Sequence, residues 1–315
     1  MKAVRFSKYG APDVLKIEEV DDPIPGPGEA LVKVSAAAIN PSDVKNVAGM
    51  FSASMPRIPG RDYAGTVVSS GYWQGREVWG SGAGFGVLRD GAQCQYLVVP
   101  KHWLSAKPEN LSMAQAATVG IPYVTAWSAL ITVGKIQAGE TLVVNGSGGA
   151  VGSAAIQIAH WRGARAIGIG ISDRPSEADF YINARHQDIQ TYVAEATNGK
   201  GADIALDTVG GPAFESTLKS LGRSGRHIAI ASSGNRRVEF DLIDFYHQEL
   251  RLYGLDTMKL NGSEIASILD VLREGFRLGA LHPQDHFLWS MEDVVDAYVA
   301  AYTGITKQRQ VISVK

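Results

Sequence analysis

The sequence predicts an α/β protein of two domains, one a small β-barrel-like domain and the other built around a parallel β-sheet. Three observations support this prediction. The chain has 315 residues, which is enough for two cores of ordinary domain size. Its first third places short strand-like runs between turns rich in Gly and Pro. From Thr141 onward, short apolar strands alternate with longer helical segments, which is the pattern of βαβ units.

The first domain is expected to cover residues 1–117. Its proline-rich segment 23–27 forms a rigid connector, because proline fixes φ and lacks an N–H donor. Helices are expected at Ser112–Ala117 and, beyond the boundary, at Tyr123–Val133, where small and apolar residues recur at helical spacing. The expected strands are Met1–Phe6, Leu15–Val20, Ala30–Ile39, Gly65–Ser69 and Gln95–Val99.

The second domain is expected to cover residues 118–256, and residues 257–315 form a return segment. This segment is short for an independent domain, so we expect it to complete the first one. It carries predicted helices at Ser263–Glu274 and Met291–Tyr302 and a last strand at Gln310–Val314. The predicted strands of the second domain are Thr141–Asn145, Ala164–Gly170, Phe180–Asn183, Asp203–Asp207, His227–Ala231 and Leu252–Leu255.

Composition and charge exclude several classes of partner. The formal net charge of -2 gives no electrostatic reason to expect nucleic acid or an anionic membrane surface as a partner. No apolar run is long and uninterrupted enough to span a bilayer, and the charged first residues do not resemble a signal peptide. The single cysteine, Cys94, rules out an intramolecular disulfide and fits a reducing compartment. We therefore expect a soluble, cytoplasmic protein without a nucleic acid or membrane partner.

The most informative motif is a glycine turn that follows the predicted strand Thr141–Asn145 and opens a helix of small residues. Its glycines recur every third residue, which suits a tight turn, a close approach of the backbone to a pyrophosphate, and close packing of helix on strand. The helix N-terminus adds a positive partial charge. We therefore predict a dinucleotide site that includes Gly146, Ser147, Gly149, Ala150, Val151 and Gly152.

The end of the second strand bears on which dinucleotide binds. An NAD-selective site places a carboxylate there to accept hydrogen bonds from the ribose 2′-OH. Here the position falls on Gly170, which leaves room for a 2′-phosphate, and Ser172 and Arg174 follow as its binding groups. We therefore predict NADP(H). If the register slips, Asp173 becomes the acidic residue of an NAD site instead.

Several motifs together resemble the medium-chain dehydrogenase/reductases, in their zinc-independent quinone oxidoreductase branch, which includes zeta-crystallin. They are the opening MKAVRFSKYGAPDVL, Ala38-Ile-Asn-Pro-Ser-Asp43, Pro59-Gly-Arg-Asp-Tyr-Ala-Gly65, Gly91–Pro100, Ile121-Pro-Tyr-Val-Thr-Ala-Trp127, the glycine turn and Asp207-Thr-Val-Gly-Gly211. The resemblance implies a GroES-like β-barrel domain and a Rossmann domain with the active site in the cleft between them. It also implies a homodimer that pairs sheet edges, for which the strand near Leu252–Leu255 is a candidate.

The resemblance also implies that no zinc is bound. Zinc members of the family resemble Cys-Gly-Ser/Thr-Asp after the Ala-Ile pair and Gly-His-Glu at the later turn. The corresponding stretches here are Asn40-Pro-Ser-Asp43 and Gly60-Arg61-Asp62, which lack the Cys and the His that bind the metal. One cysteine cannot form the four-cysteine structural lobe. Without a Lewis acid, alcohol oxidation is not expected.

Hydride addition to a quinone or a conjugated carbonyl compound requires only the nicotinamide, a binding site and a donor for the developing oxyanion. By resemblance, many enzymes of this branch have a Tyr two residues after the aspartate of the Asn-Pro-x-Asp stretch. This sequence has Lys45 at that position. The candidate catalytic residues are Lys45, Asn40, Asp43 and Tyr63. For each, a structural role is the alternative: a surface lysine, a turn cap, or a core aromatic.

Two further sites complete the predicted cofactor contacts. By resemblance, Thr125 lies beside the nicotinamide, and Asp207, Val209 and Gly210 end a parallel strand at the edge of the sheet where ligands bind. The predicted function is an NADPH-dependent reductase of a quinone or similar conjugated carbonyl. Two alternatives stay open: reduction of an enal, enone or enoyl-thioester double bond, and a nucleotide-binding structural or regulatory protein with little turnover.

Overall fold

The computed structural model describes residues 1–173, 175–304, 306 and 308–314. The chain divides into two compact units. Unit 1 consists of Met1–Val124 and Met258–Lys315, and unit 2 consists of Thr125–Thr257. The return of the chain to unit 1 after residue 257 places the C-terminal segment in the same sheet as the N-terminal third.

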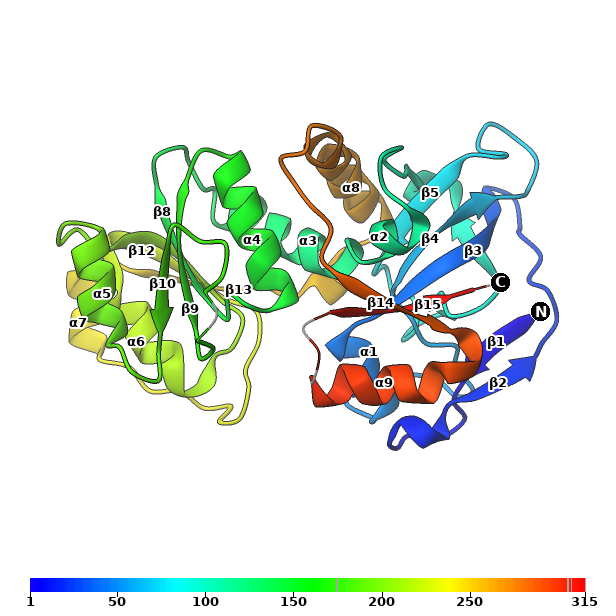
Figure 1. The fold of residues 1–315 in the computed structure, drawn as a ribbon, viewed down its shortest axis with the longest axis horizontal. Helices are drawn as coiled ribbons and strands as arrows, with labels where there is room; N and C mark the ends of the chain where they lie inside the picture. The colour runs from blue at the N-terminus through cyan, green and yellow to red at the C-terminus, as the bar shows by residue number, and fades with distance from the viewer. Residues whose placement is uncertain (174, 305, 307, 315) are drawn as a thin grey trace. The chain divides into compact units, whose positions relative to one another are not determined.

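Unit 1 contains a seven-stranded sheet in the order β14-β15-β3-β4-β5-β7, with β6 paired to β3. Among these strands, Figure 1 labels β14, β15, β3, β4 and β5. The long strand β3 (Glu29–Ile39) lies at its centre and pairs antiparallel with β4, β6 and β15. Strands β1 (Lys2–Arg5) and β2 (Lys16–Glu19) form a separate antiparallel pair. The other strands are β4 (Asp62–Val67), β5 (Glu77–Ser81), β6 (Tyr96–Pro100), β7 (Ser105–Ala106), β14 (His286–Ser290) and β15 (Arg309–Ser313).

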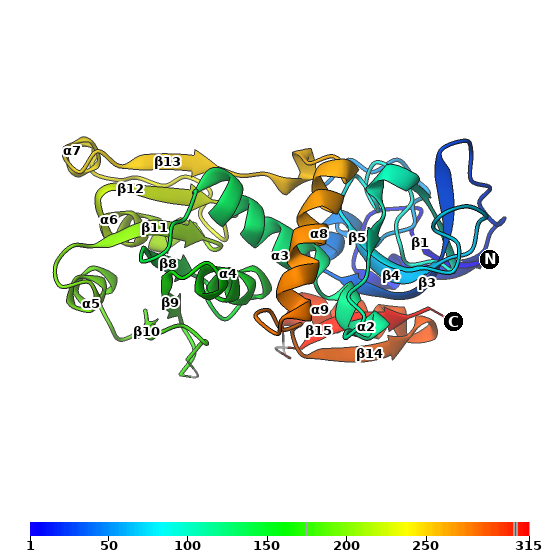
Figure 2. The ribbon, with the colours of Figure 1, turned by 90° about the horizontal axis from the view of Figure 1, so that it is seen from above.

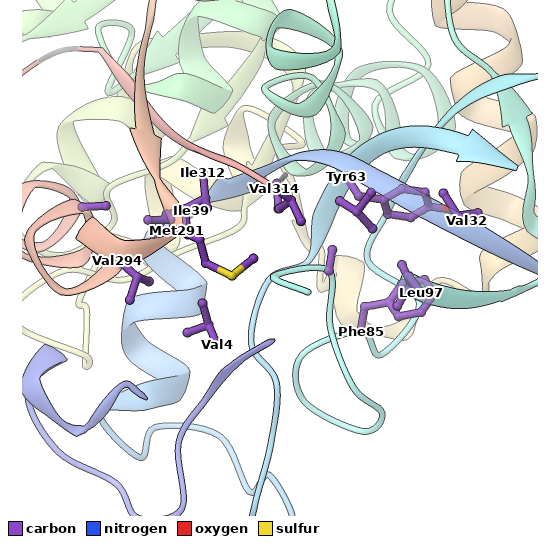
Figure 3. Close-up of a cluster of buried hydrophobic side chains, with 14 of the residues drawn as sticks. Val4, Val32, Ile39, Tyr63, Phe85, Leu97, Met291, Val294, Ile312 and Val314 are labelled. Carbon is purple, nitrogen blue, oxygen red and sulfur yellow. The ribbon is translucent and has the colours of Figure 1, made fainter. Parts of the chain in front are cut away.

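One large hydrophobic core holds unit 1 together (Figure 3). Alternate residues of β3, such as Val32 and Val34, are buried, while the intervening Lys33 is exposed, as expected for a strand with one face on the core. Residues of the return segment, among them Val294 and Ile312, belong to the same core. The helices of this unit are α1 (Pro41–Val47), α2 (Met113–Ala117), α8 (Gly262–Arg277) and α9 (Val294–Thr303).

Unit 2 is a six-stranded parallel sheet in the order β10-β9-β8-β11-β12-β13, which Figure 2 shows from β13 to β10. Every strand pair in it is parallel. The order reverses between β8 and β11, as in a Rossmann sheet. The strands are β8 (Thr141–Asn145), β9 (Arg165–Gly170), β10 (Phe180–Asn183), β11 (Ala202–Asp207), β12 (Leu221–Ala229) and β13 (Arg251–Gly254).

The helices of unit 2 connect these strands. They face the sheet with apolar or small side chains. The glycine turn leads into α4 (Ala150–Trp161), whose residues from Ala154 to Ala159 are all buried. Small residues allow this helix to approach the sheet closely. The others are α5 (Ile189–Ala196), α6 (Phe214–Lys219) and α7 (Leu242–His247). Together the two units confirm the predicted fold class: a Rossmann parallel sheet and a GroES-like β-barrel domain.

Several elements differ from the sequence predictions. Strand β12 begins at Leu221 and not at His227, because the chain stays extended through a Gly-rich stretch that lacks a strand pattern. Helix α1 was not predicted, since Asn40-Pro-Ser-Asp43 was interpreted as a turn. The predicted helix at Tyr123–Val133 begins earlier, as α3 (Gly120–Trp127), and ends in a wider π-helical turn over Ser128–Val133. Among the described residues, no helix has the length and apolar character needed to cross a bilayer.

Candidate functional site

The glycine turn lies between β8 and α4, and Gly149 is the residue that precedes the first turn of α4. Two of its glycines are required by the fold itself. Gly146 has φ of +84°, which favours glycine, and a Cβ there would overlap the Thr208 hydroxyl. A Cβ on Gly152 would overlap the backbone of Gly146. These positions explain why β8 can turn sharply into a closely packed helix.

The other two glycines of the turn are not required by the protein's own packing. A Cβ on Gly148 would meet no atom within 4 Å, and a Cβ on Gly149 would meet only the Gly146 carbonyl oxygen, at 3.3 Å. Both residues are exposed, and both lie at the positive end of the α4 dipole. No acidic side chain lies in the first turn of α4. This bare backbone fits the close approach of a pyrophosphate. Gly148 was absent from the predicted site because only every third glycine was counted.

Ser147 has a structural partner inside unit 2. It is fully buried, and both its hydroxyl and its backbone N–H donate to the carbonyl oxygen of Ile169, at 3.1 and 3.0 Å. These bonds tie the turn to the end of β9. Ala150, Val151 and Gly152 form the first turn of α4, as the fingerprint predicts.

Asp207 ends β11 directly beside Asn145, the last residue of β8. Its Oδ1 accepts hydrogen bonds from the Asn145 amide at 2.8 Å and from the backbone N–H groups of Val209 and Gly210, at 3.0 and 2.8 Å. Its Oδ2 lies 3.5 Å from Nε2 of His227, and both side chains are completely buried. Burial opposes the charged carboxylate, but the nearby His227 ring and the hydrogen bonds from these N–H groups hold the pKa of Asp207 below its usual value.

The buried Asp207 therefore fixes the turn that carries Val209 and Gly210. Gly210 has φ of +65°, and a Cβ there would crowd the backbone near Ser232. Thus Asp207 shapes, through its neighbours, the edge of the sheet at the point where the strand order reverses. Neither His227 nor its pairing with Asp207 could be found from sequence spacing.

The end of β9 provides a second reason for the small residue at Gly170. A Cβ there would crowd the hydroxyl of Tyr181, which donates to the Ser172 carbonyl oxygen at 2.8 Å. Asp173 accepts a hydrogen bond from the Asn183 amide at 2.9 Å. Arg174, the predicted partner of a 2′-phosphate, lies outside the described residues. Thr125 is buried, with its hydroxyl 3.4 Å from that of Thr257.

The candidate catalytic residues of unit 1 lie around the start of α1. Asn40 precedes the helix and Asp43 is its third residue, and the two form a capping box: the Asn40 backbone N–H donates to Asp43 Oδ2 at 2.8 Å. Burial raises the pKa of Asp43 to about 6, although the nearby charge of Arg61 and the bonds from Asn40 act in the opposite direction. The alternative weighed for these two residues was a turn cap, and in the structure they form the cap of a helix.

A second buried carboxylate, Asp62, joins the same polar cluster. It accepts hydrogen bonds from the Asn40 amide at 2.9 Å, from the Ser81 hydroxyl at 2.6 Å and from the backbone N–H of Ile121 at 3.0 Å. Arg309 of the return segment donates to the Asn40 amide oxygen at 2.6 Å. Burial raises the pKa of Asp62 despite these bonds. We define the buried polar cluster as Asn40, Asp43, Arg61, Asp62, Ser81 and Arg309.

Lys45 and Tyr63 lie in very different surroundings. Lys45 is exposed in the last turn of α1. Tyr63 is 1% exposed and lies in the hydrophobic core of unit 1, where its ring packs over Gly80 and edge-on to Phe85 with ring centres 6.0 Å apart (Figure 3). Burial raises the pKa of the Tyr63 hydroxyl well above its usual value. These surroundings favour a packing role for Tyr63, and the catalytic roles of both residues stay predictions.

Among the described residues, no group of three or more His, Cys, Asp or Glu side chains is arranged to hold a metal ion. At the two sequence positions that correspond to zinc ligands in the zinc-binding proteins that this chain resembles, it has the amide of Asn40 and the guanidinium of Arg61. Neither group is a zinc ligand of the usual kind.

Comparison with known proteins places this architecture in a family. The alcohol dehydrogenase GroES-like domain matches residues 26–109, and the zinc-binding dehydrogenase domain matches residues 150–274. A zinc-type alcohol dehydrogenase-like protein of Schizosaccharomyces pombe is 36% identical over 290 residues, covering 89% of this chain and 86% of that protein. Human quinone oxidoreductase is 28% identical over 312 residues, covering 95% and 93%. A solved NAD-dependent alcohol dehydrogenase is 27% identical with a TM-score of 0.90, covering 100% of both chains.

A Rossmann sheet with a bare glycine turn, carried on one chain with a GroES-like domain, defines a nicotinamide-nucleotide oxidoreductase. The chain belongs to the medium-chain dehydrogenase/reductase family, and quinone oxidoreductases are among its relatives, at 28% identity.

Proposed function

We propose that this protein is an NADPH-dependent reductase that transfers hydride to a quinone or a similar small conjugated carbonyl compound, without a metal ion. The observation that carries the proposal is the pair of bare glycines, Gly148 and Gly149, at the start of α4, which the protein's own packing does not require. The similarity to quinone oxidoreductases, which covers 95% of this chain, supports the choice of acceptor.

The nucleotide, when bound, supplies the hydride, and the protein contributes binding and orientation. The turn and the N-terminus of α4 would hold the pyrophosphate. The segment fixed by Asp207 would line the neighbouring edge of the sheet with the backbone of Val209 and Gly210. Thr125 would lie beside the nicotinamide, and Ser172 and Arg174 would bind the 2′-phosphate. For each acceptor reduced, one hydride adds to carbon or oxygen and one proton follows. Lys45 is the candidate for stabilising the enolate or quinolate that forms, or for holding a ribose hydroxyl.

Steady-state consumption of NADPH by the purified protein tests the proposed acceptor. We expect turnover with a small benzoquinone or naphthoquinone to exceed turnover with an alkenal. Preference for the alkenal would favour the alternative, reduction of an activated carbon–carbon double bond. Tight NADPH binding with no turnover over both groups of acceptors would favour the other alternative, a nucleotide-binding structural or regulatory protein.

The proposed preference for NADPH has its own test in Arg174→Ala. A guanidinium that pairs with a 2′-phosphate contributes a charge-assisted hydrogen bond of about 1.5–3 kcal/mol, which corresponds to a loss of affinity of about 10- to 100-fold for NADPH. The affinity for NADH should hardly change. Fluorescence titration with both nucleotides measures the ratio. Equal losses for the two nucleotides would contradict the assignment of Arg174 to the 2′-phosphate.

We further propose that the protein is a cytoplasmic homodimer that pairs two copies of β13. This strand lies at an edge of the unit 2 sheet, where backbone groups are open to pairing. Large apolar side chains nearby are exposed, among them Leu242, Ile243, Tyr246 and Leu252. Analytical ultracentrifugation should find twice the chain mass of 33.7 kDa. A single species at the mass of one chain would contradict the dimer.

A further inference from the structure

We propose that His227 is a positioning residue for the nucleotide: its ring supports the carboxylate of Asp207, which in turn keeps the backbone of residues 208–211 in the shape that receives NADPH. We call this segment the 208–211 turn. The inference rests on the proposed function, and it gives a role to a buried side chain that itself touches no ligand. His227, Asp207, the 208–211 turn and the glycine turn all belong to unit 2.

The 208–211 turn lies directly against the glycine turn. A Cβ on Gly146 would overlap the Thr208 hydroxyl and would lie 2.9 Å from a methyl group of Val209, so the two turns share one packed boundary. The N–H and the hydroxyl of Thr208 also donate to the carbonyl oxygen of Asn145, at 3.1 and 2.8 Å. A change in the conformation of the 208–211 turn would therefore move the backbone that is proposed to hold the phosphates.

The conformation of the 208–211 turn depends on one carboxylate oxygen. Oδ1 of Asp207 accepts hydrogen bonds from the Asn145 amide and from the N–H groups of Val209 and Gly210. Oδ2 has no hydrogen-bond partner among the described residues, and Nε2 of His227 lies 3.5 Å from it. Because Asp207 has no exposed surface, it needs such a neighbouring donor or positive charge to stay ionised.

The sheet and one helix hold the His227 ring beside Asp207. His227 of β12 pairs with Ala205 of β11, so its side chain emerges on the same face of the sheet as that of Asp207. The Phe214 ring of α6 packs against the imidazole, with ring centres 4.7 Å apart. The His227 side chain is completely buried, and neither of its ring nitrogens has a hydrogen-bond partner in the part of the chain that the structure describes. Its interaction with Asp207 is therefore the polar contact that accounts for a histidine at this position.

His227 is the titratable group that faces Asp207. The Asn145 amide, the backbone of the 208–211 turn and the Phe214 ring do not titrate. The charged side chains of the neighbouring elements pair elsewhere: Arg226 with Glu140 at 2.6 Å, and Lys219 with Glu215 at 3.0 Å.

Removal of the His227 ring should therefore change the protonation of Asp207. Burial favours the neutral carboxyl group, while His227 and the N–H groups hold the pKa of Asp207 below its usual value. Without the ring, Asp207 should take up a proton at a higher pH. A neutral carboxyl group accepts weaker hydrogen bonds than a carboxylate does, so the N–H groups of Val209 and Gly210 would be held less firmly.

The test compares His227→Leu, which removes both ring nitrogens, with His227→Gln, whose amide nitrogen can take the place of Nε2. His102→Leu is the control, because it removes an exposed histidine from unit 1. We expect Kd for NADPH in His227→Leu to exceed the wild-type value about 10-fold at about pH 6, and by less at about pH 8.5, where Asp207 regains its charge.

The ratio of the variant Kd to the wild-type Kd is compared at each pH, because titration of the nucleotide itself is common to all the proteins. His227→Gln should lie closer to wild type than His227→Leu does, and His102→Leu should match wild type. A ratio for His227→Leu that is the same at both pH values would indicate a packing role alone and would overturn the proposal.

Amide hydrogen exchange measured by NMR provides a second readout, which needs no nucleotide. The N–H groups of Val209 and Gly210 should exchange slowly in the wild-type protein and about 10-fold faster in His227→Leu. Exchange of both groups at the rate of an unstructured peptide in the wild-type protein would overturn the proposal even if His227→Leu did not fold. If the wild-type protein binds no nicotinamide nucleotide, the proposed function fails, and the exchange rates still decide whether His227 holds the turn.

Discussion

Gly149→Val is expected to weaken NADPH binding by about 100-fold, because the side chain would displace hydrogen bonds to charged phosphates worth about 1.5–3 kcal/mol each. The protein itself has room for the new side chain. A Cβ on Gly149 would meet only one oxygen, at 3.3 Å, and its φ of -84° is allowed for valine. The loss of NADPH affinity would therefore report on how closely the phosphates approach the backbone. The variant should also lose about 1 kcal/mol of folding stability, because valine is a poorer helix cap than glycine.

Gly152→Ala is the contrasting variant for this experiment. Its Cβ would overlap the backbone of Gly146, so we expect it to lower the melting temperature as well as the affinity. Fluorescence titration and thermal unfolding of both variants separate the two effects. Wild-type affinity in Gly149→Val would show that the nucleotide, if it binds, does not approach the backbone at this turn.

Asp43→Asn is expected to make the stability of the protein less dependent on pH between about pH 4 and pH 8. Burial raises the pKa of Asp43 from 3.8 to about 6, so the folded state holds its proton more tightly than the unfolded state. The stability that this proton contributes is present below pH 3.8 and is lost as the pH rises through 6. With 1.36 kcal/mol for each pH unit, the charged carboxylate costs about 3 kcal/mol at neutral pH.

Chemical unfolding of the wild-type protein and of Asp43→Asn, at about pH 4 and again at about pH 8, measures the free energy that the charged carboxylate costs. The amide keeps an oxygen that can accept from the Asn40 N–H, so the helix cap is retained. Relative to wild type, the variant should gain about 3 kcal/mol in unfolding free energy from the lower to the higher pH. Since the other titrating groups are common to both proteins, the same difference at both pH values would contradict the raised pKa.

The sequence predicts unit 2 more accurately than unit 1. Strands β8 and β10 begin and end at the predicted residues. Strand β8 is fully buried and is a short apolar run between turn residues, which is the pattern of a buried parallel strand. Strand β14 was missed. Among the described residues it pairs with β15 alone. The neighbouring residues Phe287 and Leu288 are both half-exposed, so no alternation of buried and exposed positions marks the strand. Edge strands with this character are difficult to recognise from one sequence.

The glycine turn could be predicted because its residues are adjacent in the chain, whereas the polar partners of the site are not. Asp207 and Asn145 are 62 residues apart, and Arg309 and Asn40 are 269 apart. The spacing of one sequence carries no information about such pairs. For the same reason, the loss of a zinc ligand at Arg61 was evident, but the burial of its charge without a full set of partners was not.

The central claim is that a nicotinamide dinucleotide rests its phosphates on the backbone between β8 and α4. Isothermal titration of the purified wild-type protein with NADPH tests this claim most directly. We expect one saturable site for each chain, with tighter binding than NADH shows under the same conditions. A titration in which neither NADPH nor NADH produces saturable heat would contradict the claim.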